Sequence, residues 1–142
     1  MDHETFQSWL EAYGRAWTTR DPKAAANLFA EGATYQETPF VAPLRGRQAI
    51  LEYWFHVSQS QEEISFGFEV LAVTQETGIA RWWASLVRVA SKVRVKLDGI
   101  FVISLDAENR CATLREWWHR QEDRTGESGA ASGRLAEAGS AA

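Results

Sequence analysis

The longest alternation of apolar and polar positions runs from Ile79 to Trp118 and predicts antiparallel strands. Three stretches rich in β-branched and aromatic residues, 79–90, 94–105 and 111–118, are separated by short polar turns. Side chains alternate between the two faces of a strand. Neither face of these strands is purely polar, so we expect helices of the same chain to cover one face and a second subunit to cover part of the other.

The alternation divides the two long strands into two sets of side chains. The first set is Trp83, Ser85, Val87, Val89, Val95, Leu97, Phe101 and Ile103. The second set is Trp82, Leu86, Arg88, Arg94, Lys96, Asp98, Ile100 and Val102. The apolar members of the second set would expose a large patch in a monomer, which predicts a homodimer through the outer face of the sheet. These members are Trp82, Leu86, Ile100 and Val102.

The N-terminal third of the chain has helical spacing. Residues 3–19 place Phe6 and four further apolar side chains at i, i+3, i+4, i+7 and i+11, which predicts an amphipathic helix. Asp21 and Pro22 are typical of an N-cap and a first helical residue, so we expect a second short helix that ends near Ala30.

The middle of the chain adds further elements. We expect a short strand at 33–37, a loop at 38–45, a third helix at 46–58 and a long strand at 64–74. Helices that precede an antiparallel meander indicate an α+β fold. A curved sheet with helices across its concave face forms a cone open at one end, which is a natural pocket for a small molecule.

Composition narrows the class of protein. The chain of 142 residues is long enough for one domain, and its net charge of −4 argues against a general affinity for nucleic acid or membrane lipid. The single Cys111 excludes an internal disulfide, and no Cys/His spacing suggests a metal site, so we predict neither metal nor cofactor. The sequence has no membrane-spanning stretch and no signal peptide, which favours a cytoplasmic protein.

The C-terminal end differs in composition from the rest. After Asp123 the chain consists of Gly, Ser, Ala and charged residues with almost nothing apolar. Such a segment cannot bury enough apolar surface to fold, so we predict a domain at 1–122 and a disordered tail at 123–142.

Aromatic residues are unusually frequent, with seven Trp and seven Phe. Three helices and one sheet of this size rarely absorb so many rings without a cavity, so we expect an apolar pocket for a flat or polycyclic ligand. The rings expected at its wall are Tyr13, Trp17, Tyr35, Phe40, Trp54, Trp83, Phe101 and Trp118.

Three runs of residues resemble a known family. The segments 28–33 (LFAEGA), 43–50 (PLRGRQAI) and 114–118 (LREWW), together with the order of elements, are similar to the nuclear transport factor two-like superfamily. Within it the chain resembles the SnoaL-like polyketide cyclase and ketosteroid isomerase branches over about residues 5–120. The resemblance implies the cone-shaped α+β fold, which hosts isomerases, cyclases, hydrolases, dehydratases and non-catalytic modules.

The resemblance also implies roles for single residues. Glu37 stands where the ketosteroid isomerases keep their carboxylate base, and Tyr13 stands where they keep an oxyanion-hole tyrosine. Trp54 replaces a supporting tyrosine of the third helix. Phe101 replaces a protonated aspartate that serves there as the second oxyanion donor, so this donor is absent.

Glu37 shares a strand face with Tyr35, which we expect to be the inner face. A carboxylate among aromatic rings has a raised pKa and suits a base that removes a proton next to a carbonyl group. The alternative is a solvated strand end. Tyr13 is either a hydrogen-bond donor to a ligand carbonyl or an ordinary core tyrosine.

Glu116 alternates with Leu114 and Trp118, which point inward by the family pattern. A buried glutamate needs a partner, and Arg81 is a candidate. The pair is either a structural ion pair, with Arg81 also able to orient a polar ligand, or Glu116 is a catalytic acid. Asp98 shares its face with basic residues and is expected to form an outward salt bridge.

Two functions therefore remain open. One is a cofactor-free acid/base enzyme acting on a small apolar carbonyl compound by isomerisation, cyclisation or dehydration, with Glu37 as the base and Tyr13 as the donor. The other is a non-catalytic module of the same fold that binds a hydrophobic ligand or mediates association.

Overall fold

The computed structural model describes residues 1–123, and the predicted α+β class is confirmed. The elements are α1 (His3–Thr18), α2 (Pro22–Ala26), β1 (Phe29–Gln36), β2 (Leu44–Arg45), α3 (Arg47–Ser60), β3 (Gln61–Val73), β4 (Thr77–Arg88), β5 (Arg94–Leu105) and β6 (Cys111–Asp123). Apart from Asp123, which ends β6, the predicted C-terminal tail lies outside the described residues.

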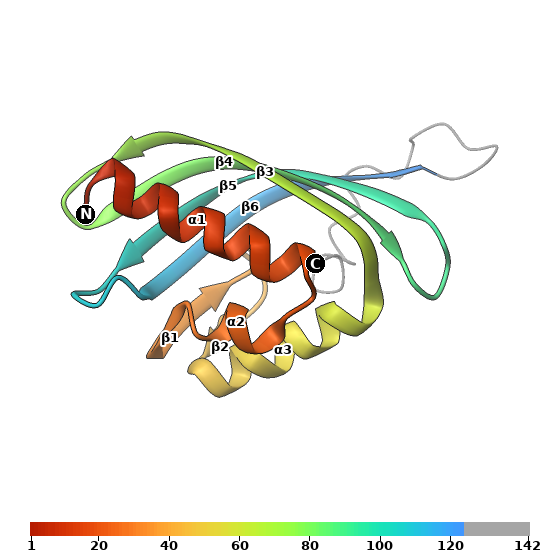
Figure 1. Cartoon of the computed structure of the whole chain (residues 1–142), viewed down its shortest axis with the longest axis horizontal. Helices are drawn as coiled ribbons and strands as arrows, with labels where there is room; N and C mark the ends of the chain where they lie inside the picture. Colours follow the sequence, from red (N-terminus) through yellow and green to blue (C-terminus); the bar gives the residue numbers. More distant parts are fainter. Residues whose placement is uncertain (124–142) are drawn as a thin grey trace.

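The six strands form one sheet in the order β2-β1-β6-β5-β4-β3. Its neighbouring strands are antiparallel except for β1 and β6, which run parallel. Figure 1 shows the sheet curving around α1, which lies along the concave side, with α2 and α3 next to β1 and β2. The core therefore lies between this concave face and the helices, as the sequence predicts.

The first two helices both begin at an aspartate cap, and the predicted cap at Asp21 is confirmed. The Asp2 carboxylate accepts a hydrogen bond of 2.7 Å from the backbone nitrogen of Thr5, and Asp21 accepts one of 3.0 Å from Ala24. The predicted apolar stripe of α1 is buried throughout, and its members are Phe6, Trp9, Leu10, Tyr13 and Trp17. None of the helices in residues 1–123 has the length and apolar character that crossing a membrane requires.

Several predicted boundaries are wrong because strand pairing extends the strands. β1 begins at Phe29, inside the predicted second helix, since Phe29 pairs with Cys111 of β6. The predicted loop at 38–45 contains β2, which pairs with Thr34 and Tyr35 of β1. β6 continues beyond Trp118 to the end of the described chain because it pairs with β5 along its length.

The predicted faces of β4 are also wrong. In the register between β4 and β5, Trp82 lies opposite Gly99 and Trp83 lies opposite Asp98. Directly opposed residues share a face, so Trp82 joins Phe101 on the inner face and Trp83 lies outside. Trp82 is 2% exposed, whereas Trp83 is 38% exposed.

The same register moves Leu86 to the inner face, where it is fully buried. The apolar patch predicted for the outer face therefore keeps Ile100 and Val102 but loses Trp82 and Leu86. Alternation within one strand divides its side chains between two faces. Which of these faces continues a given face of the next strand depends on the register between the two strands.

Candidate active site

Two glutamates lie side by side on the inner face, where β1 ends next to β6. Glu116 points inward from β6. Gln36 of the parallel strand β1 pairs with Arg115, so the following residue, Glu37, continues this register next to Glu116. The indole nitrogen of Trp118 donates a hydrogen bond of 3.0 Å to the backbone oxygen of Glu37. This bond ties the end of β1 to β6 and fixes the two carboxyl groups on neighbouring strands.

Both glutamates are buried. Glu37 is 8% exposed and Glu116 is 3% exposed. The solvated strand end considered for Glu37 is therefore wrong. Oε1 of Glu37 and Oε2 of Glu116 have no hydrogen-bond partner among the described residues. An ionised carboxylate in such a place is costly, which favours the protonated form of each group.

The pKa values of the two groups reflect this environment. Burial raises the pKa of Glu37 from 4.5 to about 8, although the Tyr53 hydroxyl opposes part of the rise. Burial also raises the pKa of Glu116 well above its ordinary value, and negative charge on Glu37 raises it further, while the Tyr35 hydroxyl lowers it. Because Glu116 is buried more deeply, we infer that Glu37 ionises first as the pH rises.

Three tyrosines from three elements surround the carboxyl pair. The hydroxyls of Tyr13 on α1 and Tyr35 on β1 are 3.2 Å apart and share a hydrogen bond. Tyr53 on α3 has a half-buried ring, and its buried hydroxyl lies close enough to Glu37 to lower the pKa of that carboxyl. Burial raises the pKa of all three phenols. They therefore remain neutral and can donate hydrogen bonds to a carboxylate or to a bound oxygen.

Aromatic rings enclose this polar group. The ring of Trp82 stacks on Phe101 with centroids 5.1 Å apart. Tyr13 meets Phe101 at 5.4 Å and Trp54 at 5.5 Å, both edge to face. The Trp17 indole donates a hydrogen bond of 2.8 Å to Gln61, whereas the indole nitrogens of Trp54 and Trp82 are buried without a described partner.

The structure brings most of the predicted site residues into this one interior cluster. They are Tyr13, Trp17, Tyr35, Glu37, Trp54, Phe101, Glu116 and Trp118. Three predicted residues lie elsewhere. Phe40, in the segment between β1 and β2, is 88% exposed, and Trp83 and Arg81 project from the outer face of β4. The expectation that these three side chains line the interior wall is therefore wrong.

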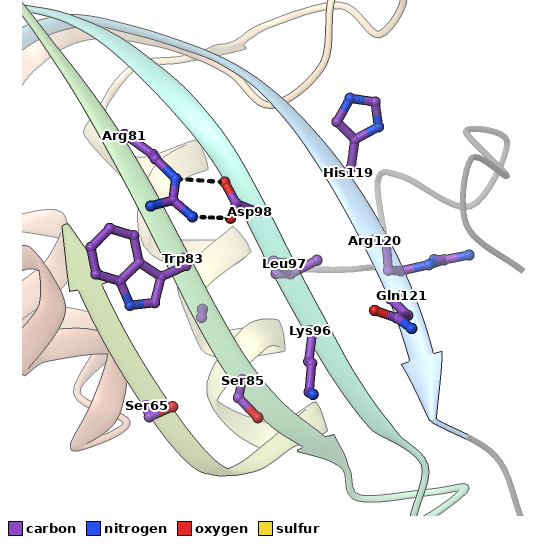
Figure 2. Close-up of a pocket in the computed structure, with 11 residues that line it drawn as sticks. Ser65, Arg81, Trp83, Ser85, Lys96, Leu97, Asp98, His119, Arg120 and Gln121 are labelled. Carbon is purple, nitrogen blue, oxygen red and sulfur yellow. Dashed lines mark hydrogen bonds and ion pairs between the residues drawn. The ribbon is translucent and has the colours of Figure 1, made fainter. Parts of the chain in front are cut away.

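The predicted ion pair between Glu116 and Arg81 does not form, because the two side chains lie on opposite faces of the sheet. Arg81 instead binds Asp98 of β5 with hydrogen bonds of 3.2 and 2.5 Å, as Figure 2 shows. The prediction of an outward salt bridge for Asp98 is confirmed.

The outer face carries a shallow groove of about 700 Å³ over β4, β5 and β6 (Figure 2). Its lining includes the Arg81–Asp98 pair, and the Arg81 guanidinium also stacks 4.6 Å from the ring centroid of Trp83. The Trp83 ring lies over Gly67 of β3, where the lack of a side chain leaves room for it. This groove is separated by the sheet from the carboxyl pair.

Two members of the interior cluster are not among the predicted site residues. Tyr53 completes the spacing i, i+3, i+4 and i+7 with Ile50, Trp54 and Val57, so helical periodicity contains the signal. Trp82 could not be placed from alternation alone, because that requires the register between β4 and β5.

The curved six-stranded sheet with helices across its concave face is the nuclear transport factor two-like fold. Within that superfamily the chain belongs to the SnoaL-like family, because the model of the SnoaL-like domain matches residues 10–126. A comparison with curated proteins finds no match.

Similar solved structures show the same fold at low sequence identity. SalBIII, an epoxide hydrolase/cyclase-like enzyme in pyran ring formation in the polyether salinomycin, is 21% identical, with a TM-score of 0.73 over 82% of this chain and 92% of that one. A candidate isomerase from Bacillus subtilis is 20% identical, with a TM-score of 0.74 over 83% and 89%. A computationally designed 17-OHP binder is 12% identical, with a TM-score of 0.72 over 83% and 96%.

Proposed function

We propose that this protein is a cofactor-free acid/base enzyme that acts on a small apolar carbonyl compound by isomerisation, cyclisation or dehydration. The observation that carries the proposal is the buried pair of carboxyl groups, Glu37 and Glu116, among neutral phenols and aromatic rings. Membership of a fold family that includes isomerases and cyclases supports it.

In this proposal Glu37 is the proton carrier. It lies at the edge of the cluster and ionises before Glu116, so its carboxylate can remove a proton from the carbon next to a carbonyl group. It then returns that proton to a different carbon, which completes an isomerisation, or to a leaving hydroxyl group, which completes a dehydration. The low polarity of the surroundings makes the carboxylate a stronger base than it is in water.

Glu116 is the hydrogen-bond donor. Its pKa stays high when Glu37 carries charge, so it keeps its proton at the pH at which Glu37 acts. A neutral carboxylic acid in an apolar site can donate a hydrogen bond to the oxygen on which negative charge develops. In this role Glu116 replaces the second oxyanion donor that is absent at Phe101, because a phenylalanine ring has no hydrogen-bond donor.

Tyr13 and Tyr35 support this donor. Their hydroxyls share a hydrogen bond, and the Tyr35 hydroxyl lowers the pKa of Glu116. We therefore assign Tyr13 a positioning role through Tyr35, in place of the direct donation to the ligand that the family resemblance implies.

Exchange of α-hydrogens tests the proposal, because removal of such a proton begins each of the reactions considered. The full chain is incubated in D₂O with the bicyclic ketone 2-decalone, and deuterium incorporation is followed by NMR. Because a general base typically contributes 10²–10⁴-fold, we expect Glu37→Gln to slow exchange by at least about 100-fold.

The control for this experiment is Glu76→Gln, which changes an exposed glutamate in the turn between β3 and β4. Exchange by this variant should match that of the unaltered protein. Equal exchange rates for Glu37→Gln and the control would contradict the enzymatic role of Glu37. Protein-independent exchange in all samples would favour the non-catalytic binding module instead.

We further propose that the protein forms a homodimer through the outer face of the sheet. Trp83 and Trp117 are 38% and 43% exposed there, which is unusual for rings of this size. The same surface carries both signs of charge, with Arg81 and Lys96 near Asp98, so a two-fold arrangement can pair it with itself.

A further inference from the structure

The groove on the outer face of the sheet has the size of a binding site for a small molecule. Its volume of about 700 Å³ lies within the range of roughly 300–1,000 Å³ that is usual for ligand pockets. Figure 2 shows Trp83 at the β3 side of the groove and His119 on β6. The sheet separates this groove from the carboxyl pair, so the proposed acid/base chemistry does not account for it.

The Trp83 ring is a fixed platform for a planar group. Its exposure of 38% leaves part of the ring open to the groove. Gly67 of β3 lies against the ring, since a Cβ atom there would collide with the indole nitrogen. The Arg81 guanidinium contacts the ring as well, 4.6 Å from its centroid. Because both contacts hold the ring in place before a ligand arrives, stacking on it requires little further ordering of the side chain.

The charges that line the groove favour an anion. The Asp98 carboxylate accepts both hydrogen bonds from Arg81, so these two charges compensate each other. Arg120 lies 3.8 Å from Glu122. Lys96 is exposed and forms no ion pair within residues 1–123. Its ammonium group is therefore available to attract a negative charge.

The strand registers set the distance between the ring and the groups that can bind an anion. Trp83 pairs with Asp98, and Lys96 lies two residues further along β5 on the same face, a diagonal separation of about 7–8 Å. Asp98 pairs in turn with His119, which is two strands from Trp83 and so about 10 Å away. The imidazole of His119 can donate a hydrogen bond. A ligand that contacts both the ring and these donors needs a spacer about the size of a sugar.

We propose that the outer groove binds a nucleoside monophosphate. The base stacks on Trp83, the sugar lies over Asp98, and the phosphate binds Lys96 and His119. Stacking on an aromatic ring tolerates every base, so the groove selects for a ring and an anion together rather than for one base. The net charge of −4 favours a single free nucleotide over a nucleic acid strand, which carries many more negative charges.

The proposed homodimer uses the same tryptophan ring. A second subunit on the outer face would cover Trp83, so the nucleotide and the second subunit compete for it. A bound nucleotide should therefore shift the protein towards the monomer. Trp117 belongs to the proposed dimer interface but is not part of the groove lining, so its replacement separates the two roles.

Three probes test the groove. Adenosine 5′-monophosphate carries both the ring and the anion, adenosine lacks the anion, and ribose 5-phosphate lacks the ring. Dissociation constants are measured by equilibrium dialysis with the full chain. NMR of the isotope-labelled full chain locates the ligand, with the Trp83 indole signal identified by its loss in Trp83→Leu. We expect the monophosphate to bind more tightly than either fragment and to shift this indole signal.

Two replacements in the groove divide the binding energy between the ring and the cation. Trp83→Leu should weaken binding of the monophosphate by at least about fivefold, as is usual for the loss of a base-stacking ring. Lys96→Gln should weaken it by about twofold to fivefold, as expected for an exposed ion pair, and should leave adenosine binding unchanged.

Matched controls change the same residue types outside the groove. Lys23→Gln removes an exposed lysine of α2 and should bind the monophosphate like the unaltered protein. Trp117→Leu removes the other exposed tryptophan of the outer face and should bind it at least as tightly, because loss of the dimer uncovers the groove. The NMR spectrum of each variant shows whether it is folded.

The proposal fails if the monophosphate does not bind or binds no more tightly than both fragments. Equal losses of affinity in the groove variants and their controls would also overturn it. Shifts of other indole signals without a shift of the Trp83 signal would place the ligand elsewhere, with the same consequence. Nucleotide binding is measured without turnover at a separate surface, so its outcome is independent of the deuterium-exchange experiment.

Discussion

At the scale of single residues, the environment of Glu37 links the site to the stability of the fold. Burial raises the pKa of Glu37 from 4.5 to about 8, so the folded protein binds this proton more tightly than the unfolded chain does. Protonation therefore favours folding. The stability contributed by this proton is fully present below about pH 4.5 and is lost as the pH rises through about 8.

We predict that the free energy of unfolding decreases between pH 5 and pH 8.5 and that Glu37→Gln reduces this decrease. One pKa unit corresponds to about 1.4 kcal/mol, so the contribution of Glu37 is roughly 5 kcal/mol at most. Urea unfolding at several pH values measures it. Glu76→Gln, with its exposed side chain, should retain the full pH dependence, and an unchanged slope in Glu37→Gln would refute the prediction.

A second prediction at this scale concerns the hydroxyl pair of Tyr13 and Tyr35. Their oxygens are 3.2 Å apart in a buried setting and share a hydrogen bond. A double-mutant cycle with Tyr13→Phe, Tyr35→Phe and the double variant should give a coupling of about 1 kcal/mol in the free energy of unfolding. Additive effects of the two replacements would show that this hydrogen bond does not form in solution.

The sequence predicts the position of a side chain best where that residue lies on a single regular helix or strand. Tyr13 falls in the apolar stripe of α1, and Glu37 follows the alternation of β1. Periodicity therefore predicts that both side chains point into the interior of the protein, and both are buried there. The predicted pair of Arg81 and Glu116 is wrong, because which faces these two side chains occupy depends on two strand registers. Only its aromatic ring suggests a place for Phe40 on the interior wall, and Phe40 lies instead in an exposed segment between β1 and β2.

At the scale of elements, the close contact between β5 and β6 depends on Gly99. A Cβ atom at this position would collide with the backbone oxygen of Trp117 and with Cβ of Trp118. Gly99 also pairs with Trp118, the residue that holds the end of β1. The absence of a side chain therefore lets β6 approach β5 and places the Trp118 indole within reach of Glu37.

We predict that Gly99→Ala destabilises the fold by about 1–3 kcal/mol, the usual cost of overpacking a well-packed region. Gly32→Ala in β1 is the matched control, since a Cβ there would have no neighbour within 4 Å. This control should leave stability unchanged within about 0.5 kcal/mol or raise it slightly. Equal thermal unfolding midpoints for the two variants would contradict the role given to Gly99.

Strands β4 and β5 show what an alternating pattern cannot predict. The alternation of β4 was predicted correctly, yet its inner and outer sides were exchanged relative to β5. Trp82 and Trp83 are adjacent rings of equal hydrophobicity, so composition could not decide which one faces the helices. The register between β4 and β5 determines which ring faces the helices. It places the exposed Trp83 opposite Asp98 and the buried Trp82 opposite Gly99.

At the scale of the whole molecule, the outer face is the surface proposed for association. Its exposed rings, Trp83 and Trp117, lie on β4 and β6 and flank β5, which bears Asp98. Ile100 and Val102 remain part of the apolar patch predicted for the outer face, because both lie on outward positions of β5. The interior carboxyl pair is on the other side of the sheet, so the proposed association and the proposed ligand binding at that pair would use separate surfaces.

We predict that sedimentation velocity at micromolar concentration shows a dimer and that Trp83→Glu shifts it to a monomer, because a buried unpaired charge at an interface is costly. Phe55→Glu is the control, since Phe55 is 44% exposed on α3, away from this face. A monomer for the unaltered protein, or an equal shift for both variants, would refute the proposed interface.

The parallel contact between β1 and β6 has a consequence for folding. Glu37 and Trp118 are joined by a hydrogen bond although they are 81 residues apart in the sequence. Contacts over such long separations form late, because a large loop must close first. A nascent chain therefore has its first helices and its β3–β5 meander available before the strand that completes the acid pair leaves the ribosome, and a partially synthesised product should lack the proposed proton-transfer site.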